Sequence, residues 1–252
     1  MYQTRVMPCL LIRGNGIVKT RKFKDAVYIG DPVNAVRIFS DKEVDEIVVL
    51  DIDASKKGFE PNYDLIAEIA GEAFMPMAYG GGIRTIDQVK RLIRSGVEKV
   101  VINTASIESV DIITQVAKIF GSQAVVGAVD VKKTLFGAYR VMVSSGTKET
   151  RLNLYEHINR LIEAGVGEIF VNNIDRDGLM TGYDLPLLKS ISEKVNVPVV
   201  ACGGAGNTEH LVMAIKEGGA SAVAAGSMFV FHGKHKAVLI NYSKELVSCN
   251  FK

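Results

Sequence analysis

Two glycine-rich stretches decide the fold: Tyr79-Gly80-Gly81-Gly82-Ile83 and Cys202-Gly203-Gly204-Ala205-Gly206. Each follows a short apolar run and precedes a helical pattern, and the glycines align at an offset of 123 residues. In the same register Thr85 meets Thr208, Gly96 meets Gly219, Val100 meets Val223 and Thr104 meets Ser227. A repeat of about half the 252-residue chain predicts two similar halves, roughly residues 1–122 and 123–252.

Outward from these stretches, apolar runs alternate with amphipathic segments along the whole chain. The runs are Val6–Ile12, Ile47–Ile52, Met75–Tyr79, Lys99–Asn103, Ala124–Asp130, Glu168–Asn172, Val197–Cys202 and Ser221–Ala225. Nearly continuous runs of Val, Ile, Leu and Ala are typical of parallel strands that are covered on both faces. Together with the repeat, they predict a single α/β domain, a (β/α)₈ TIM barrel with two half-barrels, rather than a doubly wound open sheet.

Composition limits the possible functions. The chain is 48% hydrophobic and carries a net charge of only +2, which argues against a nucleic-acid surface. Its three cysteines, Cys9, Cys202 and Cys249, fit neither a disulfide framework nor a zinc motif. We expect reduced thiols, a cytoplasmic protein with no membrane span or secretory signal, and no metal or organic cofactor.

Glycines and hydroxyls recur where predicted strands end. Gly80–Gly82 pairs with Asn103 and Thr104 in the first half, and Gly203-Gly204 pairs with Gly226 and Ser227 in the second. Active sites of such barrels lie at the carboxyl ends of the strands. Glycine lets an anion approach backbone N–H groups, so two matched sets predict two phosphate sites, although glycines can also simply form turns.

Carboxylates also follow the strands, at Asp51, Asp130 and the pair Asp175 and Asp177. An aspartate at such a position can act as a general acid or base, and Asp130 is the strongest candidate. The alternative is a helix cap or an ion pair with a neighbouring lysine.

Charged residues mark both ends of the barrel. Residues 14–30 are long and basic, which predicts a mobile lid from which Lys19 reaches a phosphate, unless they form a solvated loop. At the other end Arg5, Glu46, Lys99 and Glu168 each begin a strand. Their alternating signs predict a ring across the amino-terminal mouth, either as a gate or as a structural plug.

The order of these motifs resembles the cyclase subunit of imidazole glycerol phosphate synthase, from Arg5 to about Phe231. The most specific pieces are Gly30–Pro32, Leu50–Ser55, Tyr79–Ile83, Ile102–Ala105, Phe120–Ala124, Ile174–Gly178 and Cys202–Gly206. The resemblance implies an ammonia-dependent lyase or cyclase of histidine biosynthesis, in a heterodimer with a glutaminase subunit.

The resemblance also implies individual roles. It implies one phosphate site at Gly82, Asn103 and Thr104, and another at Gly178, Gly204, Gly226 and Ser227. It implies a general acid at Asp130, a lid lysine at Lys19, and an ammonia gate at Arg5, Glu46, Lys99 and Glu168.

One position departs from the pattern. The first strand of the family ends Pro-Cys-Leu-Asp, with a catalytic aspartate, whereas this chain reads Pro8-Cys9-Leu10-Leu11. A leucine cannot move a proton, and loss of a general acid or base typically costs about 10²–10⁴-fold in rate. This combination resembles a side branch of the family found in surface-polysaccharide gene sets, which implies ammonia delivery to a sugar amidotransferase that makes an acetamidino sugar.

Alternatives remain open from the sequence. The chain could be a true cyclase that uses Asp51 or Asp177 in place of the missing group, or a non-catalytic scaffold that activates a glutaminase. A sister isomerase that opens a ribose ring has the same half-barrels, but Leu11 argues against it and it needs no gate.

Overall fold

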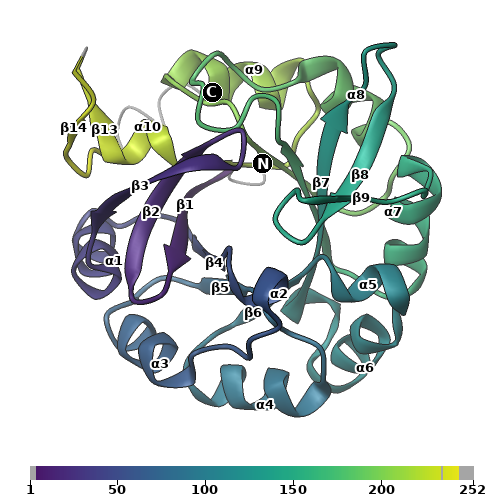
Figure 1. Cartoon of the computed structure of the whole chain (residues 1–252), viewed down its shortest axis with the longest axis horizontal. Coiled ribbons are helices and arrows are strands. Elements are labelled where there is room, and N and C mark those ends of the chain that lie inside the picture. Colours follow the sequence, from purple (N-terminus) through teal and green to yellow (C-terminus); the bar gives the residue numbers. More distant parts are fainter. Residues whose placement is uncertain (1–3, 234, 244–252) are drawn as a thin grey trace.

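Eight parallel strands close into a barrel in the computed structural model, which describes residues 4–233 and 235–243 (Figure 1). They are β1 (Arg5–Arg13), β4 (Ile47–Asp51), β5 (Met77–Gly80), β6 (Lys99–Ile102), β7 (Val125–Lys133), β10 (Glu168–Asn173), β11 (Val199–Cys202) and β12 (Ala222–Ala225). Each pairs in parallel with the next, and β12 pairs with β1 to complete the circle. The predicted (β/α)₈ barrel is therefore confirmed.

Helices cover the outside of the barrel. The longer ones are α1 (Pro32–Asp41), α3 (Tyr63–Gly71), α4 (Ile86–Arg94), α6 (Asp111–Phe120), α7 (Leu154–Glu163), α8 (Leu185–Ser192) and α9 (Thr208–Lys216). Short turns of helix follow three strands, as α2 (Ala54–Lys57), α5 (Ala105–Glu108) and α10 (Ser227–Val230), and η1 (Ser122–Ala124) precedes β7. Two short strands, β13 (Phe231–His232) and β14 (Ala237–Val238), follow α10. No helix within the described residues is long and apolar enough to cross a membrane.

Local sequence explains where these helices begin. Thr85 and Gln88 form a capping box at α4, and Asp31 caps α1, in which Pro32 occupies the first turn. Asn207 caps α9. Since the side chains of a strand alternate, every second residue points into the barrel and the others pack beneath the helices.

The two faces of the strands make two separate apolar layers. The larger layer lies between the barrel and the helices. The smaller fills the barrel itself and contains Met7, Cys9, Val48, Ala78, Val101, Val126, Ala128, Phe170, Val200, Cys202, Ala222 and Ala224. A filled interior is typical of this fold, so the functional space lies at the strand ends.

The repeat is present, but its register at the glycines is one residue shorter than the sequence alignment suggests. The helix caps Thr85 and Asn207 are 122 positions apart, and Ala78 and Val200 occupy equivalent places in the sheet at the same offset. Gly81-Gly82 therefore corresponds to Gly203-Gly204. An alignment that matches Gly80 with Gly203 is therefore one residue off. The helix caps and the strand pairing give the correct register at the glycines.

The first strand of each half continues into a hairpin. β1 continues into β2 (Gly16–Arg21) and β3 (Lys24–Gly30), and β7 continues into β8 (Tyr139–Val143) and β9 (Lys148–Glu149). Figure 1 shows them at separate places around the barrel opening. Residues 14–30, predicted as a loop, form a hydrogen-bonded hairpin. Ile17 and Val18 in this hairpin are buried, and their apolar contacts stabilise it.

Candidate active site

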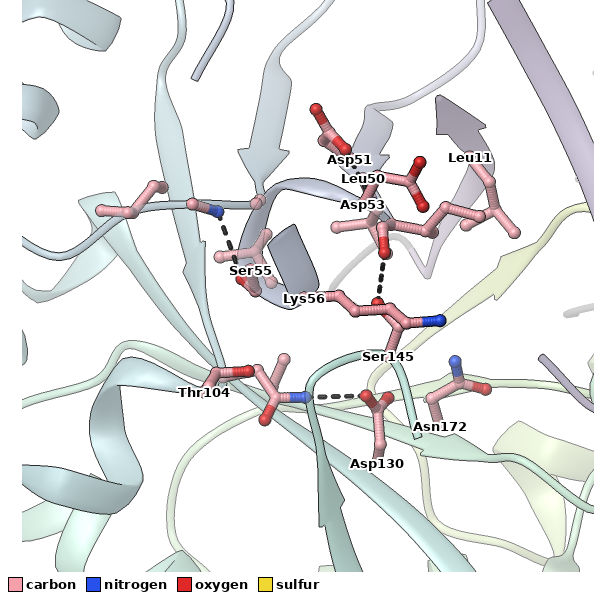
Figure 2. A pocket seen from close by; sticks show the side chains of 18 of the residues that line it. Leu11, Leu50, Asp51, Asp53, Ser55, Lys56, Thr104, Asp130, Ser145 and Asn172 are labelled. Carbon is pink, nitrogen blue, oxygen red and sulfur yellow. Dashed lines mark hydrogen bonds between the residues drawn. The ribbon is translucent and has the colours of Figure 1, made fainter. Parts of the chain in front are cut away.

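A large cavity opens at the carboxyl ends of the strands, as the fold predicts, and its space, counted together with the open solvent at its mouth, is about 1030 Å³ (Figure 2). It brings together Asp51, Asp130, Gly82, Asn103 and Thr104. The structure therefore gathers the first predicted phosphate set and two of the four predicted acidic residues in one place.

Asp130 lies at the base of this cavity. Asn103 Nδ2 donates a hydrogen bond to Asp130 Oδ2 at 2.8 Å. Burial, and after it the charge of Asp177, raise the pKa of Asp130 to about 7, against the opposing effect of the hydrogen bond from Asn103. A carboxyl group that titrates near neutral pH can both donate and accept a proton, which suits a general acid–base role.

Leu11 occupies the place equivalent to Asp130. Pro8 pairs with Ala225 in β12 as Gly127 pairs with Ile102 in β6, so position 11 in β1 matches position 130 in β7. Leu11 lines the cavity. The symmetric partner of the best catalytic candidate is therefore an apolar side chain.

Asp177 lines a second, smaller cavity rather than the large one. Thr20 Oγ1 donates to Asp177 Oδ2 at 2.9 Å. Burial raises the pKa of Asp177, while the hydrogen bond from Thr20 and the charge of Lys19 lower it. The negative charge of Asp177 is one cause of the raised pKa of Asp130, although the two carboxylates line different cavities.

Asp51 has a structural partnership. Its Oδ1 accepts hydrogen bonds from the backbone N–H of Asp53 at 2.9 Å and of Ala54 at 3.0 Å, which fixes the turn into α2. Burial raises its pKa. Asp175 likewise accepts from the backbone N–H of Lys133 at 2.7 Å. Both carboxylates therefore hold backbone N–H groups: Asp51 those of its own turn, and Asp175 that of Lys133 at the end of β7.

The first predicted phosphate set lines the large cavity. The N–H of Gly82 donates to Ser55 Oγ at 3.2 Å, and Thr104 Oγ1 accepts from the N–H of Ser144 at 3.1 Å. Gly82 has φ 71°, and a Cβ there would collide with the carbonyl oxygen of Phe59, so both the conformation and the space require glycine.

The second phosphate set lines the smaller cavity, of about 430 Å³. Gly178, Gly204, Gly226 and Ser227 meet there as predicted. Lys19 is also present, on strand β2 rather than on a loop, with only 5% of its surface exposed. Its Nζ donates to the carbonyl oxygen of Cys9 at 2.5 Å. The lysine therefore points into the second set instead of over the rim.

The four charges at the amino end form a closed ring of ion pairs. Arg5 Nη1 lies 2.6 Å from Glu46 and 3.0 Å from Glu168. Lys99 Nζ lies 2.8 Å from Glu46 and 3.0 Å from Glu168. Glu46 is 3% exposed, so the ring closes the barrel interior at this mouth.

Sequence reasoning missed several cavity residues: Ser55, Ser145, Thr20 and Asn172. Ser145 belongs to the turn after β8, whose place over the cavity could not be predicted while the hairpin itself was unrecognised. Asn172 is the residue before the last in β10, and a polar residue so close to the end of an apolar strand was an available signal. Among the described residues, no group of three or more His, Cys, Asp or Glu side chains gathers as a metal site.

Comparison with known proteins decides the family. The family model described as "Histidine biosynthesis protein" matches residues 5–236. The chain belongs to the histidine biosynthesis protein family. This confirms the resemblance inferred from the sequence motifs.

Individual members of the histidine biosynthesis protein family are similar over nearly their whole length. A Pseudomonas aeruginosa protein, provisionally named imidazole glycerol phosphate synthase subunit hisF2, is 53% identical over 96% of both chains. A Leptospira borgpetersenii protein with the provisional name subunit HisF is 50% identical over 96% of both chains. Imidazole glycerol phosphate synthase subunit HisF of Caulobacter vibrioides is 42% identical over 92% of this chain and 89% of its own.

Proposed function

We propose that this barrel receives ammonia from a glutaminase subunit and delivers it for synthesis of an acetamidino sugar of a surface polysaccharide. The observation that carries the proposal is the ion-pair ring, which closes one end of the barrel while the cavity opens at the other. The relatives are named as subunits of a synthase, which supports a heterodimer with a glutaminase partner.

The barrel interior suits transfer of a small neutral molecule. Between the ring and the cavity it is lined by apolar side chains, many of them alanine or valine. Such a lining excludes a charged ammonium ion because of the desolvation cost, but not neutral ammonia. We therefore assign the ring of Arg5, Glu46, Lys99 and Glu168 the role of an ammonia gate.

The phosphate sets support a phosphorylated substrate. Gly82, Asn103 and Thr104 would hold one phosphate, and Gly178, Gly204, Gly226 and Ser227 another. Asp130 would act as general acid. Leu11 argues against imidazole ring closure, because this position, symmetric with Asp130, has no group that can transfer a proton. The numbered names hisF2 and hisF3 among the relatives fit additional copies with a separate task.

A second candidate is the histidine-pathway cyclase itself. It is favoured by Asp177, whose charge acts on Asp130 and which could supply the missing acid–base group. Asp51 is a weaker substitute, since its Oδ1 already holds the turn into α2.

A direct assay separates the two candidates. The purified chain is given the bis-phosphate ribulosyl substrate of the histidine pathway with excess ammonium salt, and loss of substrate is followed spectroscopically. We expect binding without turnover. Turnover at ordinary enzyme rates, roughly 1–1000 per second, would establish the cyclase and remove the amidino-sugar proposal.

The partner is tested by mixing the barrel with the glutaminase subunit from the same cell and measuring glutamate release. We expect activation by the wild-type barrel and a change in the coupling of glutamine use to product in a Glu46→Gln variant. Activation without transfer of amide nitrogen to any sugar acceptor would leave only a scaffold that activates the glutaminase.

A further inference from the structure

The turn between β7 and β8 presents two large apolar side chains to solvent. Leu135 and Phe136 are fully exposed, with fractional exposures of 102% and 98%. Figure 1 shows this turn extending outward from the rim of the barrel opening. Single exposed apolar residues are common, but two adjacent side chains without any burial are typical of a contact surface for another molecule.

Hydrogen bonds hold the backbone of this turn in place. The N–H of Thr134 donates to the carbonyl oxygen of Ala138 at 2.8 Å, and the N–H of Gly137 donates to the carbonyl oxygen of Thr134 at 3.0 Å. Gly137 has φ 86°, a conformation that favours glycine. Leu135 and Phe136 therefore lie on an ordered support, and a partner that covers them does not have to order the backbone first.

The equivalent hairpin in the other half uses its turn differently. Phe23, between β2 and β3, lines the large cavity, and the N–H of Lys22 donates to the carbonyl oxygen of Asp177 at 2.9 Å. That turn is folded onto the barrel itself. Because the repeat allows an inward turn, packing within the barrel does not explain why Leu135 and Phe136 are left uncovered.

The charge of the hairpin indicates the chemistry of a partner. Between Asp130 and Glu149 the chain has four basic residues and no acidic one. The side chains of Lys132 and Lys133, directly before the turn, are exposed and form no ion pair within the part of the chain that the structure describes. A protein with an apolar pocket bordered by carboxylates would complement this pattern.

The same hairpin forms part of the wall of the large cavity. Ser145 and Thr147, after β8, line the cavity, and Ser145 Oγ donates to the carbonyl oxygen of Ile52, directly after β4. Strand β7 itself carries Asp130. A protein bound at the turn would therefore lie beside the mouth of the cavity, at the opposite end of the barrel from the ion-pair ring.

We propose that Leu135 and Phe136, together with Lys132 and Lys133, form the docking site for the sugar amidotransferase that accepts the ammonia. The inference rests on the proposed function of the barrel. Ammonia released from the cavity into water would be diluted and would take up a proton, so the accepting enzyme has to cover this mouth. The proposed glutaminase contact lies at the ion-pair ring, which leaves the turn between β7 and β8 for a different protein.

Binding of the purified sugar amidotransferase from the same cell to immobilised barrel tests the site. A variant with Leu135→Ser and Phe136→Ser should bind at least about thirty-fold more weakly than the wild type, because truncation of an aromatic anchor in an interface has an effect of this size. Ile119→Ser changes an exposed apolar residue of α6 and should bind as the wild type does. Equal affinities of the wild type and the double variant, or no binding by the wild type, would overturn the proposal.

Charge reversal provides an independent measurement at the same surface. Lys132→Glu combined with Lys133→Glu should slow association with the amidotransferase and reduce its dependence on salt concentration. Lys118→Glu, at an exposed position of α6, is the matched control and should leave both unchanged. An unchanged salt dependence in the variant with both reversals would contradict the acidic border of the partner.

Two further measurements identify the occupant of the turn. The double serine variant should activate the glutaminase as the wild type does, because the turn lies at the other mouth, and loss of activation would overturn the proposal. It should also match the wild type in sedimentation and in binding to vesicles of phosphatidylethanolamine and phosphatidylglycerol. A difference in either would assign the turn to a second copy of the chain or to a membrane surface, and not to the amidotransferase.

Failure of the docking site and failure of the proposed function are distinguishable. Transfer of glutamine amide nitrogen to the sugar is measured at limiting amidotransferase concentration. Equal transfer by the wild type and the double serine variant would keep the function and remove the site. Binding that depends on Leu135 and Phe136, without transfer of nitrogen, would keep the site and remove the function.

Discussion

The two half-sites share one backbone plan but differ in what fills them. In the first half, Gly82, Asn103 and Thr104 surround a wide cavity. In the second half, Gly178, Gly204 and Ser227 surround a narrow one that holds the ammonium of Lys19. The difference teaches that the repeat fixes where functional groups can stand, whereas single residues decide what faces each cavity: the carboxyl group of Asp130 faces the wide one and the amino group of Lys19 the narrow one.

The largest expected effect concerns the ring, where Glu46 and Glu168 are equivalent positions of the two halves. Glu46→Gln leaves Arg5 and Lys99 facing one carboxylate at a buried site, so we expect a loss of about 3–5 kcal/mol in the free energy of unfolding by urea. Glu168→Gln should cost less, since Glu168 is more exposed. Equal losses, or none, would mean that burial does not set the strength of the ring. The exposed Glu193→Gln serves as the control, at below about 1 kcal/mol.

The second prediction concerns pH and compares Asp130 with its neutral counterpart Leu11. The pKa of Asp130 is raised to about 7 from 3.8, so the folded state binds its proton more tightly than the unfolded state does. This stabilisation is complete below about pH 4 and is lost as pH rises to 7. The free energy of unfolding of Asp130→Asn minus that of the wild type should therefore be larger at pH 8 than at pH 4. The increase should be about 3–4 kcal/mol in favour of the variant. Unfolding curves of the two proteins that differ by a constant amount across this range would contradict the burial of the charge.

Leu11→Asp restores the symmetry that the sequence lacks. If the rest of the site is intact, histidine-pathway turnover should appear at a rate about a hundred-fold or more above the detection limit at which the wild type shows none. The measurement is the same ammonium-dependent assay. Leu11→Asn is the matched control, because it adds polarity without a titrating group. A folded Leu11→Asp protein that gains nothing would show that further residues have diverged.

The smallest effect compares equivalent helix positions, His157 in α7 and Ala35 in α1, each four residues after the cap. His157 is fully buried, neither ring nitrogen has a hydrogen-bond partner, and burial lowers its pKa from 6.5 to about 4. The folded state favours the neutral form of His157, so stability falls as pH drops from 6.5 toward 4. Between pH 7.5 and pH 5 the wild type should lose about 2 kcal/mol more in its free energy of unfolding than His157→Leu does, as measured by thermal or urea unfolding. An unchanged pH profile would place the histidine in contact with water.

Much of the fold could be predicted from the sequence because parallel barrel strands are buried on both faces. Their apolar runs are visible without knowledge of their neighbours, and the observed strands start within a few residues of the predicted ones. The hairpin at residues 14–30 was missed because its polar, basic strands lie at the rim, where Lys24 and Asp25 face solvent and give no apolar pattern.

The candidate site was predictable in outline for the same topological reason. Strand ends of a barrel converge, so Asp130, Asn103 and Gly82 could be placed together from their positions alone. The separation of Asp177 into a second cavity and the inward turn of Lys19 depend on side-chain packing between strands far apart in sequence. A sequence pattern within one segment cannot predict contacts between side chains of distant strands.

Strand β1 also has a mechanical consequence. It runs unbroken from Arg5 in the ring to Arg13 at the base of the hairpin, with hydrogen-bonded neighbours along its length. Nine extended residues span about 30 Å and cannot lengthen. A displacement of the hairpin along this axis therefore cannot be taken up by extension of β1 and would move Arg5 as well. The strand couples the position of the hairpin at one mouth of the barrel to the ion-pair ring at the other.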